Sequence, residues 1–149
     1  NNLTDTEIIN YLYEASAAGV NIKLIVRGMI SLVPGIKDVS ESIKARGIVD
    51  RFLEHSRFMI FCNDGEEECY ITSADMMPRN IDRRIEVTCP VFDKNIVCEL
   101  KKIFQIQWND NVKARVLDQG LTNRFTNGGK KPFQSQVEVY NYLREIHSR

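Results

Sequence analysis

The sequence lacks an excess of charge of either sign, and it has no long apolar run. Lysine plus arginine and aspartate plus glutamate number 20 each in 149 residues, so the formal net charge is +0. A neutral chain does not generate the long-range field that attracts bulk nucleic acid or an anionic membrane. Because no apolar run approaches the roughly 20 residues that cross a bilayer, we expect no nucleic acid partner and no membrane span.

Histidine and cysteine, the usual ligands of zinc, are also scarce, with two and four residues. The cysteines have no Cys-x-x-Cys spacing and no histidines grouped with them, so we predict no metal site. We interpret them as reduced, buried thiols of a cytoplasmic protein; they are Cys62, Cys69, Cys89 and Cys98. No signal peptide is recognisable near Asn1, and the start at asparagine indicates a fragment. Peripheral attachment to a membrane stays open.

Length and pattern together predict one α/β domain. A chain of 149 residues has the size of one domain, and such a chain buries roughly 70% of its unfolded surface. A helical segment is followed directly by a buried, strand-like segment, which suggests helices packed on a sheet. The patterns predict helices at 5–18, 93–107 and 135–146, strands at 22–26, 57–61, 68–72 and 85–91, and an extended piece at 112–117.

Local signals mark the ends of two predicted helices. Thr4 and Glu7 form a capping box at the start of the first helix, and Gly19 is placed to end it in a left-handed conformation. Asp93 is the expected N-cap of the second helix.

Three further segments have less regular patterns. Asp64-Gly65 favours a tight turn, so the strands on either side of it are predicted to form a β-hairpin. Residues 43–52 fit either a short helix or a strand. Residues 126–131 are rich in glycine and lysine and are predicted to form a mobile loop.

The segment around His55 contains residue types that handle phosphoryl groups. An imidazole ionises near pH 6.5, so it can exchange a proton or carry a phosphoryl group at neutral pH. His55 lies where the strand 57–61 begins, and in an extended chain Arg57 would share its face. Arg27 follows the strand 22–26, and ligands of open α/β sheets collect beyond the carboxyl ends of strands. We therefore expect Arg27 and His55 at one edge of the sheet.

Each of these residues also has a structural interpretation. A lone histidine in an apolar stretch is more often a hydrogen-bonded structural residue than a catalyst, and Ser73 fits a small strand residue. Arg83 and Arg84 fit exposed ion-pair partners, which stabilise a protein little; the nearby acids are Asp75, Asp82 and Glu86. The order of the pieces, rather than any one of them, favours a phosphate site.

The order of histidine, any residue, basic residue and apolar strand resembles the motif of the phospholipase D superfamily, in which histidine attacks phosphorus. That motif has lysine at the position of Arg57 and aspartate at the position of Cys62. It continues with glycine, serine and asparagine, where this chain has Thr72-Ser73-Ala74-Asp75. These departures make a phospholipase-D-like phosphodiesterase a less favoured alternative.

A closer resemblance covers nearly the whole chain. The segments LIVRGM, PGI, SESIKARGIVDRFLEHSRFMIF and YITSADMMPRNIDRRIEV closely resemble the carboxy-terminal phospholipase-D-like domain of the polyphosphate kinase family. The similarity continues through VKAR at 112–115 and LTNR at 121–124. It implies that residues 1–149 form one such domain, with a mixed sheet flanked by helices.

The resemblance also implies an activity, since this family reversibly transfers the terminal phosphate of ATP to inorganic polyphosphate. ATP, ADP and polyphosphate are then the ligands, and the full enzyme is expected to be a homo-oligomer. The phosphorylated histidine and the residues that bind Mg²⁺ lie in the preceding domain of the family, so this fragment alone is expected to be inactive.

For individual residues, the resemblance makes Arg27 and His55 contacts of the nucleotide phosphates. His55 is then the second active-site histidine, which donates or accepts a proton. For the other residues of the matched motif, the resemblance implies that they bind phosphate or support the site. These residues are Arg57, Ser73, Arg79, Asn80, Arg83 and Arg84. An alternative is a polyanion-binding module without activity, in which the basic pair Lys130-Lys131 would bind the polyanion.

Overall fold

The computed structural model describes residues 1–126 and 131–148. In chain order its elements are α1 (Thr6–Ala17), β1 (Ile22–Ile25), β2 (Ile43–Ile48), β3 (Phe58–Phe61), a 3₁₀ turn (Asn63–Gly65), β4 (Glu68–Thr72), α2 (Pro78–Asp82), β5 (Thr88–Pro90), α3 (Lys94–Trp108), β6 (Ala114–Leu117) and α4 (Ser135–His147). Four strands follow α1 in succession, and helices and strands alternate from β4 to α4, so the predicted α/β class is confirmed.

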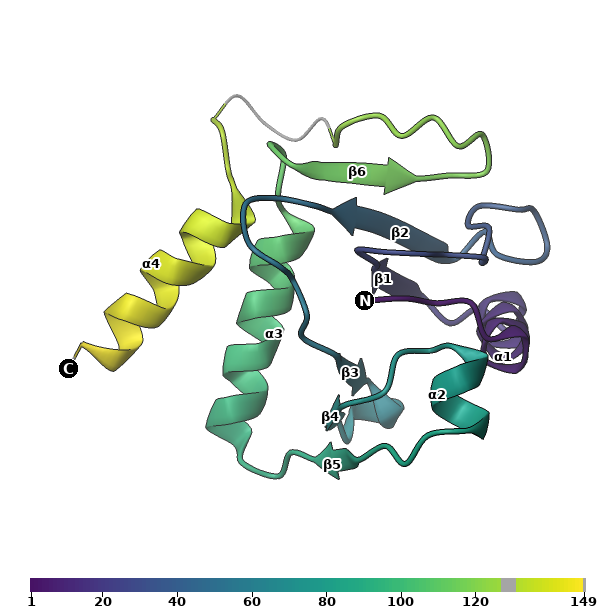
Figure 1. The fold of residues 1–149 in the computed structure, drawn as a ribbon, viewed down its shortest axis with the longest axis horizontal. Coiled ribbons are helices and arrows are strands. Elements are labelled where there is room, and N and C mark those ends of the chain that lie inside the picture. Colours follow the sequence, from purple (N-terminus) through teal and green to yellow (C-terminus); the bar gives the residue numbers. More distant parts are fainter. Residues whose placement is uncertain (127–130, 149) are drawn as a thin grey trace.

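The strands form two three-stranded sheets. The first is the mixed sheet that was predicted: β1 and β2 are parallel, and β6 is antiparallel to β2. The second has the order β3-β4-β5 and is antiparallel throughout. The N-terminal segment lies between the sheets (Figure 1), because Leu3 forms isolated parallel bridges to Ile30 and to Met76. The start of the chain is therefore held between the segments that follow β1 and β4.

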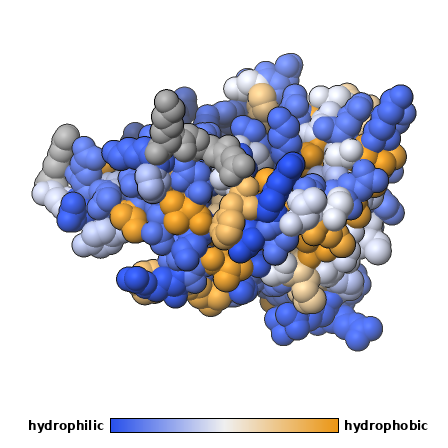
Figure 2. All heavy atoms as spheres, turned by 90° about the horizontal axis from the view of Figure 1, so that it is seen from above, coloured by the Kyte–Doolittle hydropathy of each residue, from blue (hydrophilic) through white to orange (hydrophobic). Residues whose placement is uncertain are grey.

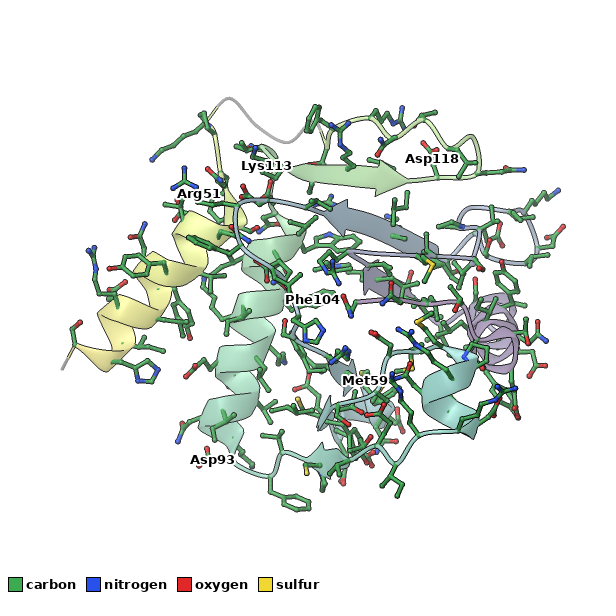
Figure 3. All side chains as sticks on the ribbon, in the orientation of Figure 1. Arg51, Met59, Asp93, Phe104, Lys113 and Asp118 are labelled. Carbon is green, nitrogen blue, oxygen red and sulfur yellow. The ribbon has the colours of Figure 1, made fainter. Side chains whose placement is uncertain are left out.

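Helix α3 joins the two sheets along one side. In Figure 1 it runs beside both of them, with α4 on its far side and α1 and α2 at the other end of the molecule. Phe104 lies on the side of α3 that faces the strands (Figure 3), and its ring meets that of Phe58 edge-on at 6.3 Å. Trp108 stacks on Phe104 at 6.0 Å, and Arg46 of β2 lies over the Trp108 ring at 4.3 Å.

A buried apolar cluster packs α1 against the first sheet and includes Leu3, Ile9, Val26, Leu32 and Ile43. The N-cap of α1 is Asp5, whose Oδ1 accepts a hydrogen bond from the N–H of Ile8 at 3.0 Å. The prediction of Thr4 as the cap was wrong, because the Thr4 N–H donates to the carbonyl of Met76 and keeps the chain extended there. Gly19 has a φ of 91° and ends α1 as predicted.

The buried side chain of Asp110 organises the turn after α3. Its Oδ1 accepts hydrogen bonds from the backbone N–H groups of Val112, Lys113 and Ala114, and its Oδ2 accepts one from the N–H of Ser135 at the start of α4. Burial acts to raise the pKa of Asp110, but these hydrogen bonds outweigh it and lower the pKa. One carboxylate thus fixes the starts of both β6 and α4.

Most other predicted elements are confirmed, with local differences. The β3–β4 hairpin forms around Asp64 and Gly65, both of which have positive φ, although the connection is longer than a two-residue turn. Residues 43–52, which fitted either a short helix or a strand, form a strand that ends at Ile48 and a loop that follows it. Helix α2 was not predicted; it begins with Pro78 at its first turn, where proline is tolerated. Residues 127–130 of the predicted mobile loop lie outside the described residues.

The prediction of four buried cysteines was wrong for three of them. Cys69 is buried in β4, whereas Cys62, Cys89 and Cys98 are exposed, because they lie after β3, on the exposed strand β5 and on an exposed position of α3. Apolar side chains also reach the surface in several patches between hydrophilic ones (Figure 2). Among the helices that the structure describes, none is long and apolar enough to cross a membrane.

Candidate functional site

The buried carboxylate of Asp75 lies at the centre of the candidate site. Its side chain is 5% exposed, and it follows the end of β4. Five hydrogen bonds reach it. Arg57 donates from Nε at 2.9 Å and from Nη2 at 3.2 Å; Asn2 donates from its backbone N at 3.1 Å and from Nδ2 at 3.0 Å; Asn1 donates from Nδ2 at 3.0 Å.

These bonds decide the charge of Asp75. Burial acts to raise its pKa, but the hydrogen bonds from Arg57 and Asn2 outweigh burial and hold the pKa well below its usual range. The hydrogen bond to Asp75 also raises the pKa of Arg57. Both groups are therefore charged at neutral pH, and they form a hydrogen-bonded ion pair in which each fixes the orientation of the other.

His55 contacts the same Arg57 guanidinium that is bonded to Asp75. Its Nε2 lies 3.1 Å from Nη2 of Arg57. The predicted juxtaposition of His55 and Arg57 is therefore confirmed, although His55 lies in the loop after β2, three residues before β3 begins, and is exposed to solvent.

The loop that carries His55 is anchored to α3 and α4. Glu54, the preceding residue, accepts hydrogen bonds from Nε2 of Gln107 at 3.2 Å and from Nε2 of Gln136 at 2.8 Å. Gln136 also exchanges two hydrogen bonds with the backbone of Phe52. His55 thus sits on a loop with fixed attachments on both sides, since Arg57 holds it from the other direction.

Arg27 joins the same network through Asn1. It follows β1, and its Nε and Nη2 donate to Oδ1 of Asn1 at 2.8 and 2.5 Å. Asn1 in turn donates to Asp75. Arg27, Arg57 and His55 are thus connected by a continuous chain of hydrogen bonds, although they come from three separate segments. The expectation that Arg27 and His55 lie at one edge of one sheet was wrong, because Arg27 follows β1 of the first sheet and His55 precedes β3 of the second; the network connects them across the two sheets.

A backbone contact at Gly28 allows the N-terminal segment to approach this closely. The N–H of Gly28 donates to the carbonyl of Asn1, and Oδ1 of Asn2 accepts from the N–H of Met29 at 2.8 Å. A Cβ atom on Gly28 would lie 2.1 Å from that Oδ1. Glycine is therefore required here for Asn2 to reach Asp75.

Ser73 and Asn80 form a second cluster around Glu86. The Ser73 hydroxyl donates to Oε2 of Glu86 and accepts from the N–H of Val87 at 3.0 Å, while Nδ2 of Asn80 donates to Oε1 of Glu86 at 2.7 Å. The hydrogen bonds from Ser73 and then Asn80 lower the pKa of Glu86. Both predicted site residues are thus engaged with the protein, and this arrangement supports the loop between α2 and β5.

The remaining predicted residues, Arg79, Arg83 and Arg84, lie on and after α2 and are exposed. The alternative that paired Arg83 or Arg84 with Asp75 is wrong, because Arg57 occupies that carboxylate. In the described part of the chain, none of the three arginines has a carboxylate within 4.0 Å. Their guanidinium groups can therefore meet an anion from solution.

The sequence reasoning did not identify Asp75, Asn1 and Asn2 as parts of the site. A signal for Asp75 was present: it is an acid placed shortly after the end of a strand, the same criterion that identified Arg27. No such signal marks Asn1 and Asn2, because their positions depend on bridges between segments far apart in the chain.

The side chains of the site are guanidinium groups and an imidazole, with carboxylates that hold them in place. No group of three or more histidine, cysteine, aspartate or glutamate side chains among the described residues could hold a metal ion. The carboxylates of Asp75 and Glu86 are already engaged with donors. Guanidinium groups and an imidazole are suited to binding and orienting oxyanions.

Comparisons with known proteins find consistent similarities. The family model described as polyphosphate kinase C-terminal domain 2 matches residues 1–136. The chain is 47% identical over 152 residues to a polyphosphate kinase of Vibrio vulnificus (strain YJ016), covering 100% of the chain and 22% of that protein. It is 43% identical over 147 residues to that of Escherichia coli (strain K12), covering 98% and 21%.

A solved structure is also similar, the crystal structure of the polyphosphate kinase from Porphyromonas gingivalis. The TM-score is 0.94 at 44% sequence identity, and the match covers 99% of this chain and 23% of that one. The chain thus spans about a fifth of the length of the relatives it matches.

Proposed function

This chain belongs to the polyphosphate kinase family, and we propose that it forms one wall of a phosphoryl-transfer site in a larger enzyme. That enzyme transfers the terminal phosphate of ATP reversibly to inorganic polyphosphate. Residues 1–149 are its carboxy-terminal phospholipase-D-like domain, and the phosphorylated histidine belongs to a preceding domain. The full enzyme is a cytoplasmic homo-oligomer, with a peripheral membrane association left open.

One observation carries the proposal: Arg27, Arg57 and His55 are joined in a single hydrogen-bonded network. Phosphoryl transfer needs positioning and neutralisation of charge more than covalent help from the protein. Two guanidinium groups and an imidazole, held by a buried carboxylate, supply both. In this assignment Arg27 and His55 contact the nucleotide phosphates.

The exposed arginines on and after α2 extend this surface. Arg79, Arg83 and Arg84 are free to meet phosphate oxygens, whereas Ser73 and Asn80 support the loop through Glu86. Beside His55, the side chains of Phe52 and Leu53 are 68% and 67% exposed. Exposed apolar groups next to a polar site are typical of a surface that another protein surface covers, which fits a site with two walls.

Mg²⁺ supplies neutralisation of phosphate charge in this reaction, and in this assignment it is held by the preceding domain. The residues described for this chain do not group carboxylates for a metal ion. Their role is to bind phosphate oxygens through guanidinium groups and to place the imidazole of His55. No step is assigned to a metal ion on this chain.

The two histidines of the chain provide a matched test. In the parent enzyme, we expect His55→Ala to reduce ATP formation from polyphosphate and ADP by about 10²-fold to 10⁴-fold, the usual contribution of a general acid or base. His147→Ala is the control, because His147 lies at the end of α4 with a side chain that is 65% exposed. Circular dichroism and thermal unfolding would verify the fold. Near-normal turnover of His55→Ala would contradict the proposal.

The isolated chain provides a second test. We expect it to form no ATP from polyphosphate and ADP, because the phosphorylated histidine is supplied by another domain. Binding of polyphosphate that weakens with salt, without turnover, is expected for one wall of the site. Robust ATP synthesis by the purified chain would contradict the assignment, and hydrolysis of a chromogenic phosphodiester would favour the phospholipase-D-like alternative.

A further inference from the structure

The contact between Arg57 and His55 determines which ring nitrogen of His55 carries the proton. A guanidinium group has five N–H donors and no acceptor. Nη2 of Arg57 lies 3.1 Å from Nε2 of His55, so Nε2 must accept this hydrogen bond. In a neutral imidazole one nitrogen donates and the other accepts. The proton of neutral His55 is therefore on Nδ1.

Asp75 fixes the geometry of this contact. Arg57 is flexible by itself, but two of its nitrogens donate to the Asp75 carboxylate, at 2.9 and 3.2 Å. Asp75 is itself held in place, because Asn1 and Asn2 donate three further hydrogen bonds to its carboxylate. Nη2 of Arg57 bonds both Asp75 and His55, so the carboxylate sets the direction from which the guanidinium meets the imidazole.

Within the described residues, Nδ1 of His55 has no competing partner: the ring contacts Arg57 through Nε2, and the side chain is exposed. An Nδ1–H group on an exposed ring is a hydrogen-bond donor that an oxyanion can accept. The nearest basic residues of the network, Arg57 and Arg27, are engaged with Asp75 and Asn1.

We propose that Asp75 is a positioning residue that acts through Arg57 to hold His55 as the Nδ1–H tautomer, so that the ring presents a hydrogen-bond donor to an incoming phosphate oxygen. This rests on the proposed function for the identity of the ligand, but the tautomer and the role of Asp75 do not depend on it. When the substrate arrives, His55 then donates a hydrogen bond from Nδ1 instead of accepting one there. Arg57 acts as the group that orients the ring.

Nuclear magnetic resonance can read the tautomer directly in the 149-residue chain. With ¹⁵N-labelled histidine, the long-range couplings from the ring protons identify which nitrogen is protonated. The chain has two histidines, so a His147→Gln variant assigns the signals. At about pH 8.5, roughly two units above the ordinary imidazole pKa, we expect the Nδ1–H form of His55 in about tenfold excess, which corresponds to about 1.4 kcal/mol.

Four variants separate the contributions. We expect Arg57→Met, which has no donor, and Asp75→Asn, which has no charge, to shift His55 toward the Nε2–H tautomer that predominates in an unconstrained histidine. Asp75→Glu keeps the charge and is expected to retain more of the Nδ1–H form than Asp75→Asn. Asp118→Asn is the control, because it alters a carboxylate that bonds Thr122 and Arg124 in the loop after β6, and it should leave His55 unchanged.

Two results would overturn the inference. One is an Nε2–H tautomer of His55 in the unmodified chain. The other is an unchanged tautomer in folded Asp75→Asn when Arg57→Met changes it. If Asp75→Asn does not fold, exchange of the Arg57 Nε–H with solvent decides the role of Asp75. The exchange of the Arg57 Nε–H should be slower than that of the exposed Arg84 Nε–H. Equal exchange rates would refute the positioning role of Asp75. Because no spectrum requires turnover, failure of the kinase assignment remains a separate result.

Discussion

Arg57 and Asp75 form a two-point ion pair, with Nε and Nη2 of the guanidinium donating to the two carboxylate oxygens at 2.9 and 3.2 Å. The hairpin topology explains why residues separated by 18 positions meet. Arg57 immediately precedes β3 and Asp75 follows β4, and the N–H of Thr72 donates to the carbonyl of Arg57 at 2.9 Å. The start of one antiparallel strand and the end of the next necessarily lie side by side.

This geometry predicts the stability of variants at Asp75. Removing one partner of a buried ion pair leaves an uncompensated charge, so we expect Asp75→Ala to lower the free energy of unfolding by about 3 to 5 kcal/mol. Urea unfolding followed by circular dichroism measures this. Glu67→Ala is the control, because Glu67 pairs with Lys101 at an exposed position and its loss should cost less than about 1 kcal/mol. Equal effects of the two variants would contradict the central role of Asp75.

The same carboxylate predicts how stability depends on pH. Asp75 has a lowered pKa in the folded chain, while in the unfolded chain it ionises near pH 3.9. At pH values between these two, the unfolded chain binds a proton that the folded chain does not, so the free energy of unfolding falls as the pH falls. We expect the loss to begin near pH 5 and to continue below pH 3.9. In Asp75→Asn the free energy of unfolding should depend less steeply on pH. Urea titrations at each pH measure this, and the same pH dependence in both chains would refute it.

The fold was predictable where a local pattern decides the structure. Three local signals each act through the backbone of a few neighbouring residues: Asp93 caps α3, Gly19 ends α1, and Asp64-Gly65 turns the chain between β3 and β4. All three are found at the predicted positions. Thr4 was predicted incorrectly because its backbone N–H is used by Met76, a residue far away in the sequence. Local capping signals cannot report such a competitor.

The site was predictable for residues that follow strand ends or share a strand face. Arg27 and Arg57 were identified in this way, and the contact of Arg57 with His55 follows from their spacing of two. The sequence could not show whether Ser73 faces a ligand or Glu86, because both environments suit a hydroxyl group. The connection from Arg27 to Asp75 also depends on the N-terminal segment, whose position between the two sheets no local pattern encodes.

The cysteines provide a test of burial in the second sheet. Cys62, Cys89 and Cys98 are exposed, whereas Cys69 is buried, and burial raises the pKa of the Cys69 thiol. Because the thiolate is the reactive form, we expect three thiols to react rapidly with a maleimide at neutral pH and Cys69 to react only when the chain is unfolded. Mass spectrometry after timed labelling gives the count and the positions. Rapid labelling of Cys69 in the folded chain would contradict the packing of β4.

Gly28 tests whether the N-terminal segment holds the site together. A Cβ atom at this position would lie 2.1 Å from Oδ1 of Asn2, an atom fixed by the N–H of Met29. We therefore expect Gly28→Ala to displace the Asn2 side chain and to remove its Nδ2 hydrogen bond to Asp75. Since each such bond to a charged group contributes about 1.5 to 3 kcal/mol, the expected loss of stability in urea unfolding is at least 1.5 kcal/mol.

The control for this variant is Gly120→Ala, where a Cβ atom would lie 3.4 Å from the Thr122 side chain. That contact is near the ordinary range, so a change below about 0.5 kcal/mol is expected for a surface position. The effect of Gly28→Ala should also disappear when Asn2 is shortened to alanine, because the clash and the side-chain hydrogen bonds of Asn2 are then both absent. If the Gly28→Ala penalty persisted in the Asn2→Ala background, its cause would lie in the backbone of the Arg27-Gly28 segment and not in the support of Asp75.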